Sequence, residues 1–290
     1  AGIAVGCSSA KSTLNITDYE TEEIGEVQDD TPQNDNKPQK EDSKTDIKGD
    51  LKVHFLNVGQ GDSEFVEFAD GTCMLIDAGE KEYGEFVLDY IKNLGYKKID
   101  YVVATHPHSD HIGGMPYVLN NIEVGNVFLP NITHDSVTFE KMLEAIDNHN
   151  INAVITDNTT QIKEGITVVS PVKDVEYEDL NDWSIVLHLE YGNTSFMFTG
   201  DAEENAEGYF TGDLSADVLK MGHHGSSTSS SDDFLNKVNP TYVVVSCGAN
   251  NKYGHPHLET VKKVQERDCK AFATYANGTI TAVSDGKGIT

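Results

Sequence analysis

The chain has 290 residues, of which 38% are hydrophobic, and its formal net charge is −27. Residues 1–50 hold five lysines and twelve acidic residues, a net charge of −7, so residues 51–290 carry the remaining −20. Arg267 is the only arginine, and this balance excludes an extended basic nucleic-acid surface, which needs Lys and Arg to neutralise phosphates.

The start of the chain resembles a bacterial lipobox, because small residues precede a cysteine in Gly6-Cys7-Ser8-Ser9. In that pattern the cysteine receives a lipid, whereas the alternative is a chance cysteine. The residues that follow Cys7 are polar and acidic, so they bury too little apolar surface to offset their ordering entropy. We therefore expect residues 1–50 to be a lipid-anchored, disordered acidic tether on the extracellular face of the membrane. The membrane would be contacted only through the lipid on Cys7.

Residues 51–290 have the pattern of one continuous domain. No run of 18 apolar residues occurs, so no membrane-spanning helix is predicted. Strands are expected at 52–57, 64–68, 72–76, 101–104, 127–129, 153–155, 166–170, 184–191, 195–199, 218–221, 242–246, 271–274 and 279–283. Helices are expected at 86–94, from about 111, at 139–146, at 233–237 and at 258–265. Strict βαβ alternation is absent, which favours a layered α/β or α+β sandwich with mixed sheets. Three further cysteines read as buried free thiols rather than a disulfide framework: Cys73, Cys247 and Cys269.

The densest chemical signal follows the predicted strand at 101–104. Four potential metal ligands fall within six residues: His106, His108, Asp110 and His111. Imidazole and carboxylate suit a divalent cation such as zinc. The spacing lets the first two histidines point one way from an extended loop, while the other two ligands face a second metal at the turn into a helix. The alternative is a His-rich surface loop that binds metal only adventitiously.

Two more predicted strands end in residues of the same kind. An apolar strand ends at Asp201, which is placed to bridge two metals, and another ends in the pair His223-His224. Each feature alone has an ordinary structural explanation. Three strand ends that all finish in ligands predict a preorganised metal site held by a packed sheet.

With these motifs, the chain resembles the metallo-β-lactamase superfamily, and within it the soluble hydrolase domain of the ComEC competence family and its stand-alone relatives. The matching stretches include 55–63, 75–79, 106–114, 199–201, 223–226 and 250–256. The resemblance implies a four-layer αββα sandwich with its site at one edge. It also implies two divalent metals, zinc or else manganese or iron, held by His106, His108, Asp110, His111, Asp201 and His223.

The resemblance implies further roles around the metals. Asp77 would orient ligands, Asp110 would serve catalysis as well as metal binding, and His224 and His255 would lie near the substrate. Contacts to substrate would come from Ser226, Asn251, Tyr253 and His255. Many superfamily members supply a third histidine to the first metal where this chain has Asn181-Asp182-Trp183. Either Asp182 substitutes for it from beside the site, or the first metal keeps an open position.

The expected function is two-metal hydrolysis of a phosphodiester through a metal-bound hydroxide. The family resemblance suggests nucleic acid as the substrate, and the expected location suggests a cell-wall phosphodiester. One alternative is a C–N or ester hydrolase on the same fold. Others are a catalytically silent metal-binding module and a purely structural lipoprotein.

Overall fold

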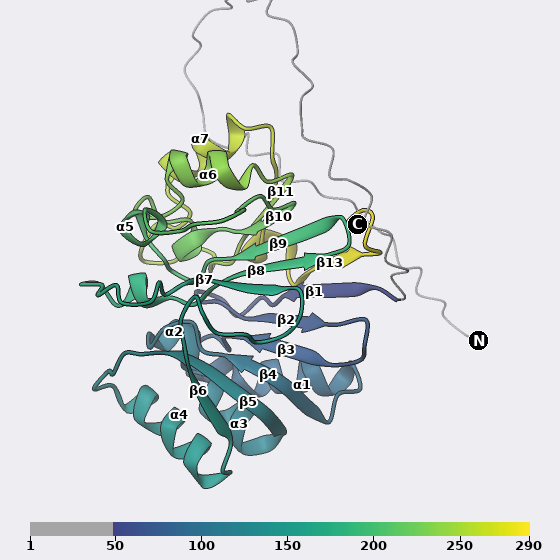
Figure 1. The fold of residues 1–290 in the computed structure, drawn as a ribbon, viewed down its shortest axis with the longest axis vertical. Helices are drawn as coiled ribbons and strands as arrows, with labels where there is room; N and C mark the ends of the chain where they lie inside the picture. Colours follow the sequence, from purple (N-terminus) through teal and green to yellow (C-terminus); the bar gives the residue numbers. More distant parts are fainter. Residues whose placement is uncertain (1–48) are drawn as a thin grey trace, which may run out of the picture.

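The computed structural model describes residues 49–290, so the predicted tether over residues 1–48, with Cys7, lies outside the described residues. Two mixed β-sheets form the centre of the described part (Figure 1). None of its helices is long and apolar enough to cross a membrane. Its cysteines are free thiols, as expected, and Cys73 and Cys247 are buried.

The first sheet has seven strands in the order β13-β1-β2-β3-β4-β5-β6. Pairing is antiparallel from β13 to β3 and parallel from β3 to β6. The last strand, β13, pairs with the first, β1, and forms one edge of this sheet. Its strands are β1 (Leu51–Phe55), β2 (Glu64–Glu67), β3 (Cys73–Ile76), β4 (Lys98–Val103), β5 (Glu123–Pro130), β6 (Asn152–Thr156) and β13 (Ile280–Ser284).

The second sheet has six strands in the order β12-β11-β10-β9-β8-β7. The β8–β9 hairpin turns at Gly192-Asn193, as expected, and β9 to β12 pair in parallel. Its strands are β7 (Ile166–Ser170), β8 (Val186–Tyr191), β9 (Thr194–Phe198), β10 (Val218–Lys220), β11 (Tyr242–Val245) and β12 (Lys270–Ala273).

Helices cover the outer face of each sheet (Figure 1). The helices from the first half of the chain are η1 (Lys81–Tyr83), α1 (Gly84–Asn93), α2 (Ser109–Ile112), α3 (Met115–Asn121) and α4 (Val137–Asn148). Those from the second half are η2 (Asn181–Trp183), α5 (Glu204–Glu207), η3 (Gly222–Gly225), α6 (Asp232–Val238), α7 (Leu258–Gln265) and α8 (Thr274–Asn277).

Three buried apolar clusters separate four layers. One lies between the two sheets, one between the first sheet and α1, α3 and α4, and one between the second sheet and α5 to α7. Alternation along β3 shows why, since Met74 and Ile76 enter the cluster between the sheets while Cys73 and Leu75 enter the helix-side cluster. The expected αββα sandwich is therefore confirmed.

The helix expected to begin near His111 is two helices instead. It begins at Ser109, breaks at Gly113-Gly114, and resumes as α3. A Cβ on Gly114 would lie 2.3 Å from the carbonyl oxygen of Ala78, so only glycine allows this approach of the backbone to the end of β3. The break fixes the loop that carries the histidines against the sheet.

Candidate metal centre

The residues with ligand chemistry follow the carboxyl ends of parallel strands. Asp77 follows β3, the His106–His111 stretch follows β4, Asp201 follows β9, and the His223-His224 pair follows β10. Because β3 and β4 are parallel neighbours, and β9 and β10 are too, each pair of ends meets at one edge of its sheet. The two edges lie together near α2 (Figure 1).

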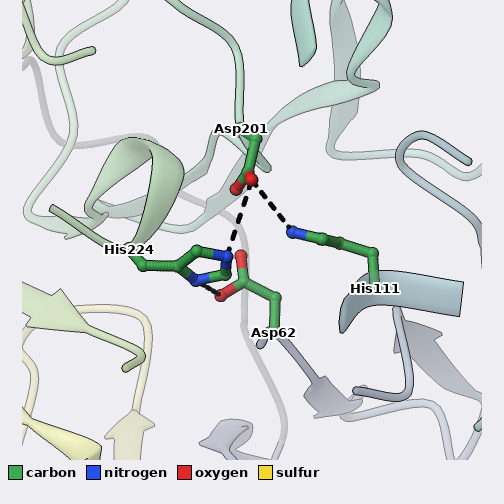
Figure 2. A group of neighbouring side chains, drawn as sticks. All are labelled: Asp62, His111, Asp201 and His224. Carbon is green, nitrogen blue, oxygen red and sulfur yellow. Dashed lines mark ion pairs between the residues drawn. The ribbon is translucent and has the colours of Figure 1, made fainter. Parts of the chain in front are cut away.

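Four buried side chains form the centre of this edge: Asp62, His111, Asp201 and His224 (Figure 2). Each offers a ligand atom, and these atoms lie within 4.8 Å of one another. The Oδ2 atom of Asp201 lies 3.2 Å from Nε2 of His111 and 3.5 Å from Nε2 of His224. The same oxygen lies 3.6 Å from Nε2 of His223 and 3.9 Å from Nε2 of His106. One carboxylate oxygen thus faces four imidazole nitrogens.

Several polar atoms of this cluster are buried without a hydrogen-bond partner among the described residues. They include Nε2 of His111, Nε2 of His224 and one oxygen of Asp201. Buried polar groups are normally paired, because an unpaired one costs its desolvation energy. Imidazole nitrogens and carboxylate oxygens are the donor set of zinc and similar cations. The residues present therefore fit the divalent metals that the sequence predicts.

His106 and His108 form a second group of side chains with ligand chemistry, and His106 lies 3.9 Å from Asp201. Their Nε2 and Nδ1 atoms lie 3.0 Å apart. Burial and the neighbouring His111 hold the pKa of His106 well below its usual range, so its imidazole is neutral, as a metal ligand must be. His134, which the sequence analysis did not single out, has its ring centroid 6.4 Å from that of His108. A lone histidine in a polar loop gives no sequence signal for this proximity.

Asp77 lies behind His111, on the side away from Asp201. Its carboxylate accepts hydrogen bonds from the backbone and the hydroxyl of Thr105 at 2.9 and 2.5 Å, and from Nδ1 of His111 at 2.8 Å. With Nδ1 held by Asp77, Nε2 is the nitrogen of His111 that points toward Asp201. This placement suits the orienting role that the resemblance implies.

The two neighbouring histidines after β10 point to different places. His223 and His224 both have a positive φ, of 47° and 54°, a region that non-glycine residues rarely adopt. His224 is buried, and its Nε2 lies 3.4 Å from Asp110 and 3.5 Å from Asp201. His223 is partly exposed, and its Nδ1 lies 3.1 Å from Glu203. Nε2 of His223 also faces Asp201, at 3.6 Å, so burial rather than distance separates the two, and His224 instead of the expected His223 belongs to the buried cluster.

Neighbouring charges explain the protonation of the buried centre. Burial opposes a charge on His224, but the carboxylates of Asp201 and Asp62 outweigh burial and raise the pKa of its imidazole to about 10. Burial likewise opposes a charge on Asp110, yet His224 and His111 hold the pKa of its carboxyl well below the usual value. The carboxyl group of Asp110 is therefore ionised, and the imidazole of His224 carries a proton on the nitrogen that a metal cation would bind.

A cavity of about 290 Å³ opens onto these groups. It is lined by Gln60, His108, Ser109, Asp110, Asn181, Asp201, His223, His224, Tyr253 and His255. None of these residues is a lysine or an arginine. An anionic substrate in this cavity would therefore depend on bound cations and on imidazole groups for its charge contacts.

The residues expected to contact substrate separate into two groups. Tyr253 and His255 line the cavity, and their rings stack with centroids 5.6 Å apart. Ser226 is buried, with its hydroxyl 3.0 Å from that of Thr228. Asn251 uses its amide on the backbone of its own loop, including the amide nitrogen and carbonyl oxygen of His255. Ser226 and Asn251 are therefore not among the lining residues, and Asn251 shapes the loop that presents His255.

Both carboxylate oxygens of Asp182 are engaged by neighbouring groups of the chain. Its two carboxylate oxygens accept hydrogen bonds from the backbone of Glu203 and the side chain of Asn205, both at 3.0 Å. These contacts hold the start of α5 against η2 and leave Asn181 as the cavity-lining residue of that segment. Of the two expectations for the missing third histidine, the placement of Asp182 favours an open position on the first metal.

Residues 56–249 match the family model described as the metallo-beta-lactamase superfamily, and the chain belongs to that superfamily. Its members are mostly metal-dependent hydrolases.

Within the superfamily, the chain is similar to competence proteins. It is 32% identical over 257 residues to ComE operon protein 3 of Bacillus subtilis, covering 81% of this chain and 33% of that protein. It is 30% identical to competence protein ComA of Neisseria gonorrhoeae, covering 80% of this chain and 32% of that protein. The chain thus spans about one third of the length of these relatives.

Solved structures share the fold at low sequence identity. The metallo-beta-lactamase fold protein YhfI from Bacillus subtilis has a TM-score of 0.52 and 11% identity, over 82% of this chain and all of that one. CmlA, a diiron β-hydroxylase from Streptomyces venezuelae, has a TM-score of 0.52 and 15% identity, over 81% of this chain and 54% of that one.

Proposed function

We propose that the chain is a binuclear metal-dependent hydrolase that cleaves a phosphodiester. The observation that carries the proposal is the Oδ2 atom of Asp201, which faces four imidazole nitrogens from two separate segments within 3.9 Å. A carboxylate between two groups of imidazoles is the arrangement that holds two dications close together.

The proposed ligands fall into two sets that share Asp201. The first metal would be held by His106 and His108, and the second by Asp110, His111 and His224. This revises the expected assignment of the neighbouring histidines, because His224 is buried beside Asp110 while the ring of His223 reaches Glu203. Zinc is the expected metal, with manganese and iron as alternatives.

Two bound dications would supply Lewis acidity toward the phosphoryl oxygens and lower the pKa of a water toward neutrality. The chain itself supplies hydrogen bonds at the cavity wall. Gln60 accepts from the backbone of Gly248 at 3.1 Å, so its amide NH₂ faces Nδ1 of His255 at 3.4 Å. His255 then carries its proton on Nε2.

Burial and the nearby imidazoles of His224 and His223 lower the pKa of His255 to about 4. The ring is therefore neutral at pH 7. We propose that His255 donates a hydrogen bond from Nε2 to a substrate oxygen rather than acting as a cationic acid.

The substrate is proposed to be a phosphodiester that enters as a short or locally exposed segment. The likeness to competence proteins supports nucleic acid. The net charge of −20 over residues 51–290 and the lack of basic lining residues oppose a long duplex. Arg267, the one arginine, is tied to Asp232 at 2.7 Å and to Asn236 at 2.9 Å. A cell-wall phosphodiester remains the second candidate substrate.

A substrate panel tests the reaction class. Purified protein with measured metal content is assayed against bis-(p-nitrophenyl) phosphate, p-nitrophenyl phosphate, p-nitrophenyl acetate and a chromogenic lactam. Metal-dependent turnover that is fastest on the diester supports the proposal. Turnover only on the acetate or the lactam would establish the ester or C–N alternative, and full metal content without turnover would establish a silent metal-binding module.

We also propose that Cys7 carries a lipid and holds the enzyme on the extracellular face of the bacterial membrane. The composition of residues 1–50 supports this, because an acidic polar segment suits a tether. Mass spectrometry of the membrane fraction tests it. An unlipidated Cys7 in native protein would contradict the anchor without affecting the proposed chemistry.

A further inference from the structure

A buried pair of opposite charges lies behind His224. The ammonium of Lys220 lies 2.5 Å from Oδ2 of Asp62 and donates a hydrogen bond to the carbonyl oxygen of Met221 at 2.9 Å. Both side chains are 1% exposed. A buried ammonium is costly unless it is paired and hydrogen-bonded, so Asp62 is held in place by Lys220. Neither residue stands out in the sequence, because each lies in or beside a short apolar strand.

The two nitrogens of His224 face different surroundings (Figure 2). Nδ1 donates to the carbonyl oxygen of Ser246 at 3.0 Å and lies 3.1 Å from Oδ1 of Asp62. Nε2 makes no hydrogen bond among the described residues and faces the carboxylates of Asp110 and Asp201. Acceptors therefore surround one nitrogen, and metal-binding carboxylates surround the other.

We propose that Asp62, although it lies close enough to the cluster to be taken for a ligand, is a positioning residue that makes His224 a ligand of the second metal. Its negative charge, together with the Ser246 carbonyl, keeps the imidazole proton on Nδ1 and the lone pair of Nε2 directed at the metal position. Lys220 keeps the carboxylate there. The inference rests on the proposed binuclear centre and adds to it three residues that lie behind the ligands: Asp62, Lys220 and Ser246.

The surroundings of Asp62 argue against direct ligation. One of its oxygens is engaged by the ammonium of Lys220, and the other lies beside the nitrogen that carries the proton. Its backbone is fixed as well, because its amide donates to the carbonyl oxygen of Asp110 at 3.1 Å and its carbonyl accepts from Gly79 at 2.8 Å. To reach the metal, Asp62 would have to leave Lys220 as an unpaired buried charge.

Glu64 offers a matched control. It is as buried as Asp62 and comes two residues later. One of its oxygens has no hydrogen-bond partner among the described residues, and no contact joins it to His224 in that part of the chain. Burial and the nearby Asp62 raise the pKa of Glu64 well above its usual value, so Glu64→Gln replaces one neutral group of this buried region with another and alters no contact to His224.

The experiment measures Co²⁺ binding to wild type, Asp62→Asn, Asp62→Asn/Lys220→Met, Glu64→Gln and His224→Ala. Competition with a chelator of known affinity gives two dissociation constants, and the visible spectrum at saturation reports the ligand set. Thermal unfolding shows whether each variant is folded. The double variant removes both buried charges, so it tests the inference even if Asp62→Asn alone does not fold.

Asp62→Asn and the double variant are expected to weaken one of the two constants by about 10- to 100-fold, the usual effect of removing a group that orients a ligand. Their spectra at saturating Co²⁺ should match that of wild type, and Glu64→Gln should leave both constants unchanged. Constants within twofold of wild type in both Asp62 variants would overturn the inference.

Two other outcomes would also overturn it. If the double variant recovered wild-type affinity, Asp62 would be only the counter-ion of Lys220. If saturated Asp62→Asn had the altered spectrum of His224→Ala, Asp62 would be a ligand itself. Wild-type protein that binds fewer than two Co²⁺ ions would instead overturn the proposed binuclear function on which the inference rests.

Discussion

Replacing Asp201 with asparagine removes the one charge that both proposed metals share. In the structure its Oδ2 faces four imidazole nitrogens at 3.2 to 3.9 Å, and the side chain is buried. Removing a group that only orients a metal ligand already weakens metal binding by about 10- to 100-fold. Loss of the shared charge itself should weaken metal binding by roughly 100-fold or more, which corresponds to about 2.8 kcal/mol or more of binding free energy.

The fold should tolerate this change. The backbone amide of Asp201 donates to the hydroxyl of Ser184 at 3.0 Å, and that contact does not involve the carboxylate. Circular dichroism should therefore be unchanged, while elemental analysis after dialysis and turnover of bis-(p-nitrophenyl) phosphate should both fall.

Asp232→Asn is the matched control, because it removes one negative charge at an exposed ion pair with Arg267. It should retain both metals and full activity. Asp201→Asn protein that keeps two metals and turns over at a rate close to wild type would refute the bridging role.

His224→Ala should lose one metal whereas His223→Ala retains both, and elemental analysis showing the reverse would restore the assignment expected from sequence. The pKa of His224 is raised to about 10 without metal, so metal binding below that pH should release at least one proton, and metal affinity should rise as the pH is raised from 6 to 9. Calorimetry in buffers of different ionisation enthalpy should show this proton release. A metal affinity that does not depend on pH would contradict the prediction. Phe198→Ala should lower the free energy of unfolding by about 3–5 kcal/mol, because Phe198 is 1% exposed and packs between the sheets against Phe196 and Phe55. Denaturant unfolding measures this loss, and a loss below about 1 kcal/mol would contradict the packing.

The sequence predicted elements best where apolar periodicity is long and uninterrupted. The strand at 166–170 and the helix at 258–265 match β7 and α7 at both ends. Short elements were missed, because three or four polar residues carry no periodicity. One is η2, which carries Asn181 and Asp182, and another is α5, whose Asn205 donates a hydrogen bond to Asp182.

The sequence predicted which strand ends bring His and Asp side chains together, but not how those side chains point. Ligands at strand ends could be read from the sequence because parallel strands bring their carboxyl ends together. The divergence of His223 and His224 could not, since it depends on two consecutive residues with positive φ. Nor could the role of Asp62, whose partner Lys220 is 158 positions away in the chain and reaches it only when the two sheets pack.

The most direct test of the account is metal content and diesterase activity measured on the same preparation of the wild-type protein. Elemental analysis should find about two equivalents of divalent metal per chain. Turnover of bis-(p-nitrophenyl) phosphate should disappear with a chelator and return when the metal is restored. Folded protein that holds less than one equivalent after metal is supplied, or that hydrolyses the diester equally well with and without metal, would contradict it.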